Sequence, residues 1–282
     1  MLAIHEFSSL SDISVDIFSS PSEFQLVVFE RGIKFEFQVN CKSLASSLIV
    51  FGQSALGNRD LELPVFHRGS WANDFERSST IALNDPTLYL SDELLGGWFQ
   101  GTRDHFYMTT CAEIVQKIAQ LMGLSNDKVV FYGSSAGGFS SLMMACDVPG
   151  SHVVAEVPQI DMNQYHVKSA LANICKYSYQ VNEIEQVNLT YPSRINVISR
   201  MMEIPQIPNI YFIQNIADNL HIDRHLIPFM NYLNERFRGG SEFSSKVMVA
   251  WFFKVTPSGD GHLPADRNFS VGVVKDAIAK FI

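Results

Sequence analysis

The stretch Val129-Val-Phe-Tyr-Gly-Ser-Ser-Ala-Gly-Gly138 decides how this sequence folds. An apolar run of β-forming residues ends in Gly133-Ser-Ser-Ala-Gly137, and apolar residues at helical spacing follow at once. Such a sharp turn between a strand and a helix lifts a serine hydroxyl clear of the sheet, next to helix N–H groups that favour an oxyanion. The pattern predicts that Ser135 is a nucleophile. The alternative is a Gly/Ser-rich turn in which Ser135 only caps the helix.

Composition indicates one globular α/β domain spanning residues 1–282. Hydrophobic residues make up 46% of the 282 residues and charged residues 18%, which excludes a disordered chain. The net charge of −8 argues against a nucleic-acid partner or an anionic membrane surface. No apolar run approaches the length of a membrane span, and the first residues lack the basic and apolar regions of a signal peptide. The four cysteines show no CxxC spacing, so we expect a reducing, cytoplasmic setting.

The chain divides into a β-rich start and a long alternation of strands and helices. Residues 1–45 include an alternating strand at 33–39 and a more apolar one at 24–30, joined by a turn at Arg31-Gly32. These strands are expected to form an antiparallel edge of the sheet. The alternation that follows predicts a mostly parallel central sheet covered by helices on both faces. Its expected strands are 47–52, 80–83 (continuing towards 90), 128–132, 152–157, 209–214 and 246–253, and its expected helices include 105–122, 224–237 and one at the C-terminus.

Residues 161–208 are too long for a simple connection between two strands. They contain helical patterns near 163–176 and 191–203, broken by Pro192. We interpret the segment as a helical cap over the mouth of the sheet, the alternative being an ordinary pair of packing helices.

A serine hydroxyl needs a base, and that base needs an acid to orient it. In a parallel sheet both must come from loops at the carboxyl ends of the strands. His262 lies in a Gly/Pro-rich loop after the last expected strand, and Asp218 follows the strand at 209–214. Asp218 is therefore the predicted acid; its alternative role is a helix N-cap. Asp161 is the second candidate for the acid, while Asp260 lies too close in sequence to the histidine to be preferred.

The order Ser135, Asp218, His262 is the one found in α/β-hydrolases. The sequence resembles a serine α/β-hydrolase over residues 45–282, through G-S-S-A-G-G at 133–138, D-N-L-H at 218–221 and G-D-G-H at 259–262. The stretch L-G-G-W-F-Q-G-T-R-D at 95–104 is also similar to bacterial surface-glycan proteins: capsule-biosynthesis hydrolase-like proteins and the acetyltransferase of accessory secretion systems. The resemblance implies an α/β-hydrolase fold.

The sequence departs from many esterases in the loop that supplies oxyanion donors. An H-G-G-G-like run is replaced by Phe51-Gly-Gln-Ser-Ala-Leu56. We expect the backbone N–H of Gln53 or Ser54 to act together with that of Ala136. Candidate substrate contacts lie in two further loops, where aromatic rings and guanidinium groups suit a sugar or a carboxylate; the alternative is that they only brace the loops. These residues are Arg68, Trp71, Trp98 and Arg103.

Together these features predict a serine esterase or acyltransferase that acts on an ester, such as an acetyl group on a bacterial surface glycan, without a cofactor or metal. The expected partner is a small-molecule or glycan substrate. One alternative is a metal-dependent hydrolase built on four residues close in sequence: Asp218, His221, Asp223 and His225. The other is an inactive module that uses the same fold to bind a glycan or a protein.

Overall fold

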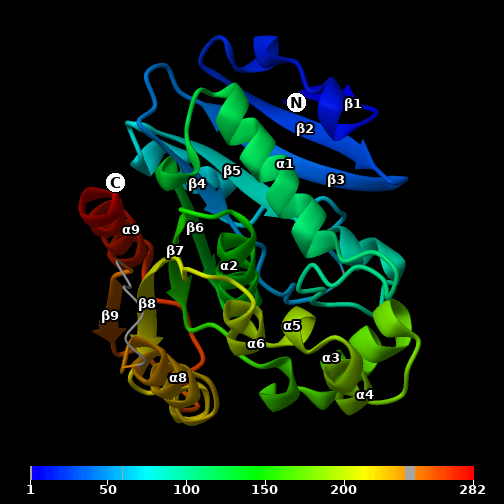
Figure 1. The fold of residues 1–282 in the computed structure, drawn as a ribbon, viewed down its shortest axis with the longest axis vertical. Coiled ribbons are helices and arrows are strands. Elements are labelled where there is room, and N and C mark those ends of the chain that lie inside the picture. Colours follow the sequence, from blue (N-terminus) through cyan, green and yellow to red (C-terminus); the bar gives the residue numbers. More distant parts are fainter. Residues whose placement is uncertain (1, 59, 239–244) are drawn as a thin grey trace.

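A computed structural model describes residues 2–58, 60–238 and 245–282. Its nine strands form one sheet in the order β1-β2-β3-β5-β4-β6-β7-β8-β9 (Figure 1). The strands are β1 (Ala3–Phe7), β2 (Ser22–Glu30), β3 (Ile33–Cys41), β4 (Ser47–Phe51), β5 (Ser78–Asn84), β6 (Val129–Ser134), β7 (His152–Glu156), β8 (Asn209–Asn215) and β9 (Val247–Phe252).

The α-helices occupy the connections between the strands, mostly in the second half of the chain. They are α1 (Tyr107–Leu121), α2 (Ala136–Asp147), α3 (Lys168–Ile174), α4 (Ile184–Thr190), α5 (Pro192–Ile195), α6 (Val197–Met202), α7 (Asn219–His221), α8 (Ile227–Arg238) and α9 (Arg267–Phe281). Among the described residues, no helix combines the length and the apolarity that a membrane crossing requires.

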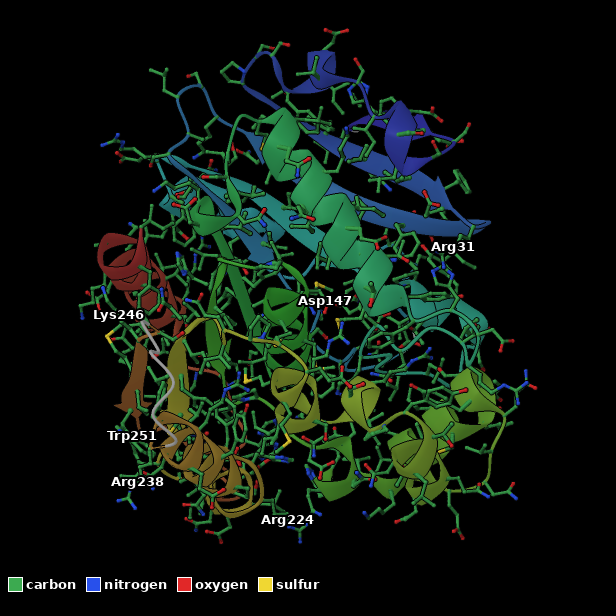
Figure 2. The ribbon with its side chains drawn as sticks, in the orientation of Figure 1. Arg31, Asp147, Arg224, Arg238, Lys246 and Trp251 are labelled. Atoms are coloured by element: carbon green, nitrogen blue, oxygen red, sulfur yellow. The ribbon has the colours of Figure 1, made fainter. Side chains whose placement is uncertain are left out.

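The predicted antiparallel edge is confirmed. Strand β2 pairs antiparallel with β3, and β3 pairs antiparallel with β5, whereas every pair from β5 through β9 is parallel. Arg31 and Gly32 form the predicted hairpin turn, both with positive φ (52° and 77°), as a tight two-residue hairpin requires (Figure 2). The outermost strand, β1, runs parallel to β2.

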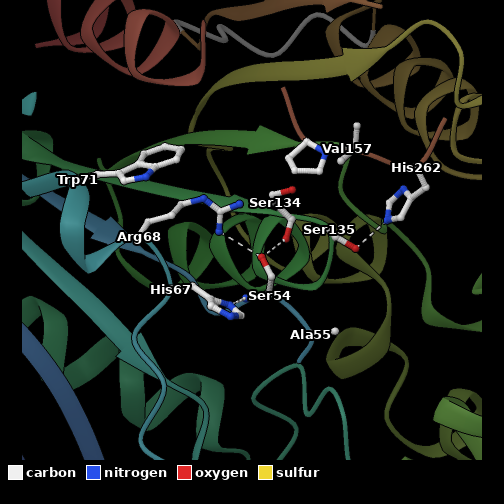
Figure 3. A pocket seen from close by; sticks show the side chains of 10 residues that line it. Ser54, Ala55, His67, Arg68, Trp71, Ser134, Ser135, Val157 and His262 are labelled. Carbon is white, nitrogen blue, oxygen red and sulfur yellow. Dashed lines mark hydrogen bonds between the residues drawn. The ribbon is translucent and has the colours of Figure 1, made fainter. Parts of the chain in front are cut away.

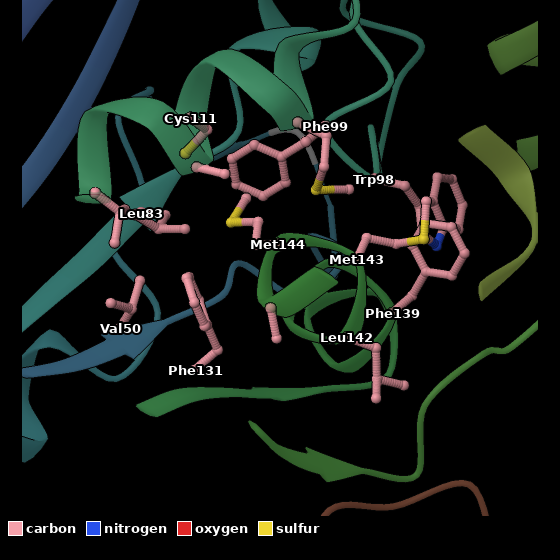
Figure 4. Packing of buried hydrophobic residues seen from close by; sticks show 14 of the residues in the cluster. Val50, Leu83, Trp98, Phe99, Cys111, Phe131, Phe139, Leu142, Met143 and Met144 are labelled. Atoms are coloured by element: carbon pink, nitrogen blue, oxygen red, sulfur yellow. The ribbon is translucent and has the colours of Figure 1, made fainter. Parts of the chain in front are cut away.

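Both faces of the central strands are buried, as the alternation of strands and helices predicted. On β4 and β6, Val50 and Phe131 point into one core with α1 and α2, shown in Figure 4. Their neighbours Phe51 and Tyr132 point into a second core beneath α9. Successive strand side chains alternate between faces, so helices are needed on both sides to cover them.

Two sequence predictions fail at element boundaries. The strand expected to continue towards residue 90 ends at Asn84, and a 3₁₀ turn occupies Pro86–Leu90. Pro86 has no N–H for a strand ladder, while the Asp85 side chain accepts the Thr87 N–H and starts the turn. The helix expected from 224 begins as a π-helical turn at Ile222–Leu226 before α8.

The long segment between β7 and β8 forms the short helices α3 to α6, below α2 in Figure 1. Pro192, which was expected to break a helix, occupies the first turn of α5, where its missing N–H costs nothing. Arg200 of α6 donates from Nε to the Asp147 carboxylate at the end of α2 over 3.0 Å (Asp147 is labelled in Figure 2). This contact ties the helical segment to the core of the sheet.

Candidate active site

Ser135 lies at a strained turn between β6 and α2. Its backbone has φ 55° and ψ −119°, which a residue other than glycine adopts only when the surrounding structure enforces it. Close packing around the turn holds Ser135 in this conformation. The packing is so tight that a Cβ on Gly133 would collide with the Gly137 carbonyl group. The Ser135 N–H is donated to the Glu156 carbonyl oxygen of the neighbouring strand over 2.9 Å. The turn expected from the sequence therefore forms, and it points the hydroxyl away from the sheet.

Three side chains that are distant in sequence meet at this turn. Ser135 Oγ lies 2.9 Å from His262 Nε2, and His262 Nδ1 lies 2.8 Å from Asp218 Oδ2 (Figure 3 shows the first pair). An ionised carboxylate only accepts hydrogen bonds, so Asp218 holds the proton on Nδ1 and leaves Nε2 to accept the serine hydroxyl. Asp218 also accepts the His221 N–H and caps α7, so the two roles weighed from the sequence coexist.

Asn215, at the end of β8, fixes the histidine loop against the acid. Its side-chain amide donates to the carbonyl oxygens of Lys254 and Gly261, each over 2.6 Å. Its Oδ1 accepts the N–H groups of Ala217 and Lys254. The last strand and the loops that carry Asp218 and His262 are thus joined by one buried side chain. Asn215 was not predicted from the sequence, although its position at the end of a buried strand is a usable signal.

A second histidine shares the acid. His221 Nδ1 lies 3.0 Å from Asp218 Oδ1, the oxygen that His262 does not use. The rings of His221 and His262 stack in parallel, with centroids 3.9 Å apart and planes 10° apart. Gln159 links this histidine to the serine, because its Nε2 donates to Ser135 Oγ over 2.9 Å and lies 3.4 Å from His221 Nε2. Neither Gln159 nor the position of His221 beside His262 was predicted from the sequence.

The surroundings keep Asp218 charged and His221 neutral. Burial alone would raise the pKa of Asp218, but the hydrogen bonds from His221 and His262 outweigh it and hold this pKa well below its usual range. Burial lowers the pKa of His221. The hydrogen bond with Asp218 favours the charged imidazole and opposes this shift, but burial is the larger cause. The pair therefore carries one negative charge at neutral pH, next to the imidazole that would take a proton from Ser135.

Known proteins match this chain in structure rather than in sequence. No family model matches it, and no curated protein sequence is similar to it. Solved structures that match it include the capsule O-acetyltransferase of Neisseria meningitidis serogroup A, at 16% identity and TM-score 0.64, covering 89% of this chain and 96% of that one. The fluorophosphonate-binding serine hydrolase F of Staphylococcus aureus matches at 14% identity and TM-score 0.58, covering 93% and 98%. Acetyl xylan esterase 1 of Thermoanaerobacterium sp. also matches, at 14% identity and TM-score 0.57, covering 93% and 84%.

The chain has an α/β-hydrolase fold. At these identities the likeness concerns the fold alone. The order of strands, the turn at Ser135 and the loops after β8 and β9 agree with the fold that the sequence resemblance implied.

Within this α/β-hydrolase fold, the two candidate oxyanion donors of the β4 loop differ. The Ser54 N–H is already donated to His67 Nδ1 over 3.0 Å, whereas no acceptor for the Gln53 N–H is found in the described parts of the chain. The Gln53 side chain is buried, and its Oε1 accepts the Asp85 N–H. Ala136 begins α2, so its N–H has no acceptor within the helix. The geometry favours Gln53 with Ala136 over Ser54.

A cavity of about 450 Å³ opens beside Ser135. Two of the four predicted substrate contacts, Arg68 and Trp71, line it together with Ser135 and His262 (Figure 3). Trp98 does not line it, because the ring is buried in the core and its Nε1 lies 3.4 Å from Gln159 Oε1. Arg103 does not line it either, and its largely exposed side chain lies near Asp104.

The four-residue metal set considered from the sequence does not assemble. Asp223 is exposed, and His225 Nδ1 accepts the Ile160 N–H from inside the core. A different trio has ligand atoms within 4.8 Å of one another: Asp218, His221 and His262. In this trio both carboxylate oxygens already accept hydrogen bonds from the two imidazoles, so the same atoms are engaged in a hydrogen-bond network.

Proposed function

We propose that the protein is a serine esterase or acyltransferase in which Ser135 is the nucleophile, His262 the base and Asp218 the acid that orients it. The observation that carries the proposal is the continuous hydrogen-bonded chain from Ser135 Oγ through His262 to Asp218 at the wall of a cavity. A hydrogen-bond network that only stabilised the fold would not require a serine with a strained backbone at its exposed end. The same three groups in this order perform acyl transfer in other hydrolases.

In the proposed reaction, Ser135 Oγ attacks the ester carbonyl carbon as its proton passes to His262 Nε2. The negative charge on the carbonyl oxygen is stabilised by the N–H groups of Ala136 and Gln53. The tetrahedral intermediate then collapses, and His262 returns the proton to the departing alcohol. An acyl-Ser135 ester remains. Water or a sugar hydroxyl attacks it with His262 again as base, which releases the acid or the new ester and restores Ser135.

An ester of a sugar is the substrate class that we propose. Two of the structural matches bear names that describe acetyl transfer to a capsule and removal of acetyl from xylan. The cavity of this chain is lined by Trp71, whose flat ring suits a sugar face, and by polar groups such as Ser54. A small acyl group such as acetyl fits the proposal best.

The test is covalent labelling of the folded protein with a fluorophosphonate probe, followed by mass mapping. Ser135 should be labelled, and Ser135→Ala should lose both labelling and hydrolysis of 4-nitrophenyl acetate, by about 10⁴-fold or more in kcat. In His262→Ala, kcat should fall by a similar factor while the fold stays intact. Absence of labelling in the folded wild-type protein would favour the non-catalytic binding module instead.

Adding sugar acceptors separates transfer from hydrolysis. If the protein is a transferase, an acceptor carrying free hydroxyls should raise the rate of 4-nitrophenol release and yield an acetylated sugar by mass spectrometry. If it is an esterase, only acetate should appear.

A further inference from the structure

Arg68 is held rigidly at the end of the cavity away from His262 (Figure 3). Its backbone is left-handed (φ 66°) and precedes the 3₁₀ turn Gly69–Asp74. The guanidinium carbon lies 5.4 Å from the ring centre of Trp71 and 5.2 Å from that of Tyr132. Its Nη1 donates to Ser54 Oγ over 3.2 Å. Two aromatic contacts and one hydrogen bond therefore fix the orientation of the group.

This guanidinium has no carboxylate partner within residues 2–58, 60–238 and 245–282. Arg267 provides an internal contrast, because it also approaches the Trp71 ring (5.8 Å) but pairs with Asp74 over 2.8 Å. The chain has 29 acidic residues against 21 basic ones, so counter-charges are plentiful elsewhere. A partly buried arginine with unused donors is costly unless something else satisfies it.

The cavity offers no internal acid for this role. None of the described residues that line it is acidic. The buried carboxylate of Glu156 accepts the Tyr132 hydroxyl, the Ala265 N–H and the Ser270 hydroxyl. Asp218 is occupied by its two histidines. Positive charge at this end therefore remains uncompensated by the protein.

We infer that Arg68 binds an anionic group of the substrate, a carboxylate or a phosphate, in the cavity that contains Ser135. The inference rests on the proposed function, since it names the class of ester that the site takes: one that carries a negative charge. The planar guanidinium keeps donors free to face such a group, with Trp71 as a flat wall beside it. The charge can belong to the acyl part or to the alcohol part of the ester.

The experiment compares matched esters in two arms. The acyl arm uses mono(4-nitrophenyl) glutarate against 4-nitrophenyl pentanoate, and the alcohol arm uses 4-acetoxybenzoate against its methyl ester. For each pair, kcat/KM for the charged ester is divided by kcat/KM for the neutral one, in wild type and in Arg68→Gln. We expect the wild-type ratio to exceed the variant ratio by at least tenfold in one arm, as for loss of a charge-assisted hydrogen bond. The arm that responds identifies the charged part.

Two control variants separate charge recognition from general damage. Arg68→Lys keeps a positive charge and should retain most of the preference. Arg267→Gln removes the other arginine beside Trp71, whose charge Asp74 already neutralises, and should leave the ratio within twofold of wild type. Dividing by the neutral ester removes any shared loss that Arg68→Gln causes through Ser54.

A binding measurement makes the two proposals separable. In Ser135→Ala, titration with glutarate followed by tryptophan fluorescence should saturate, whereas glutaramide or the added Arg68→Gln substitution should abolish the response. If probe labelling fails but this titration saturates, the proposed reaction is wrong and the anion site stands. If Ser135 is labelled while both ester ratios change less than twofold and the titration is flat, the anion site is wrong.

Discussion

The two ends of the cavity differ in how completely the protein satisfies its own polar groups. At the His262 end, both ring nitrogens of His262 and both oxygens of Asp218 have hydrogen-bond partners inside the protein. At the Arg68 end, the guanidinium has one side-chain hydrogen bond, to Ser54 Oγ, and its buried Nε has no partner among the described residues. A saturated network holds reacting groups in place, whereas unused donors await a ligand. The contrast agrees with our two proposals, which place the reaction at the His262 end and anion binding at the Arg68 end.

Removing the charge of Asp218 should break the saturated end most severely. In Asp218→Asn, an amide can present its N–H₂ group to His262 Nδ1 and so favour the wrong tautomer, with the proton on Nε2. Ser135 would then lose its base. We expect kcat to fall by about 10³–10⁴-fold, as for loss of the acid in a serine triad. The measurement is steady-state hydrolysis of 4-nitrophenyl acetate, with circular dichroism to confirm folding.

Asp161→Asn is the matched control, because Asp161 was the second candidate for the acid. Its carboxylate accepts the backbone N–H and the side-chain amide of Asn163 and has no hydrogen bond with His262. The variant should keep kcat within about threefold of wild type. A loss in Asp161→Asn as large as that in Asp218→Asn would contradict the assignment of the acid.

A smaller loss should follow substitution of Gln159, which connects the serine to the second histidine. Gln159→Leu removes the donor to Ser135 Oγ, so the hydroxyl is free to rotate away from His262. One neutral hydrogen bond is worth about 0.5–1.5 kcal/mol, which corresponds to a drop of up to about tenfold in kcat. Because Gln159 would act by positioning the nucleophile, the rate of fluorophosphonate labelling should fall in parallel while KM changes little.

Trp98→Phe tests whether the support behind Gln159 matters. It removes the indole N–H that lies 3.4 Å from Gln159 Oε1, together with one of the two indole rings, and keeps an aromatic ring in the core. A change below threefold is expected, since that contact is long. If Gln159→Leu keeps wild-type kcat and labelling rate, the amide has no positioning role.

Much of the saturated end could be predicted from the sequence, because its signals are local. The apolar strand, the glycines and the helix pattern around Ser135 specify a turn by sterics alone, and the loops of Asp218 and His262 follow identifiable strands. In a parallel sheet, the ends of such strands lie together, so the meeting of these three side chains was predictable. The mostly parallel sheet with helices on both faces followed from the same alternation of strands and helices, and the α/β-hydrolase fold was what the resemblance of the motifs implied.

The contacts of the remaining residues depend on three-dimensional packing that sequence spacing does not encode. Gln159 and His221 contact Ser135 and Asp218 only because two loops converge and two imidazole rings stack. Trp98 and Arg103 looked equivalent to Arg68 and Trp71 in sequence, yet one is buried in the core and the other is exposed outside the cavity. The choice between Gln53 and Ser54 depended on a hydrogen bond to His67, which no pattern indicates.

The unpaired charge of Arg68 should also affect the pKa of its neighbour His67. This is the smallest of the effects that we predict. Burial, together with the positive charge of Arg68, lowers the pKa of His67 from its ordinary value of 6.5 to about 4. An NMR titration of wild type should find this low value. Arg68→Gln should raise it but leave it below 6.5, because burial is the larger cause. Arg267→Gln, where the arginine is paired with Asp74, should leave it unchanged.

The same titration has a consequence for stability. Between about pH 6.5 and pH 4 the unfolded chain binds a proton at His67 that the folded protein does not bind. The contribution of His67 to the free energy of unfolding therefore falls as the pH falls. The slope is at most about 1.4 kcal/mol per pH unit for one proton, and less here because His67 is partly exposed. Urea unfolding at several pH values should show a shallower slope in Arg68→Gln than in wild type. A pKa of His67 that Arg68→Gln leaves unchanged or lowers would show that the guanidinium charge is neutralised and that the two ends of the cavity do not differ in this respect.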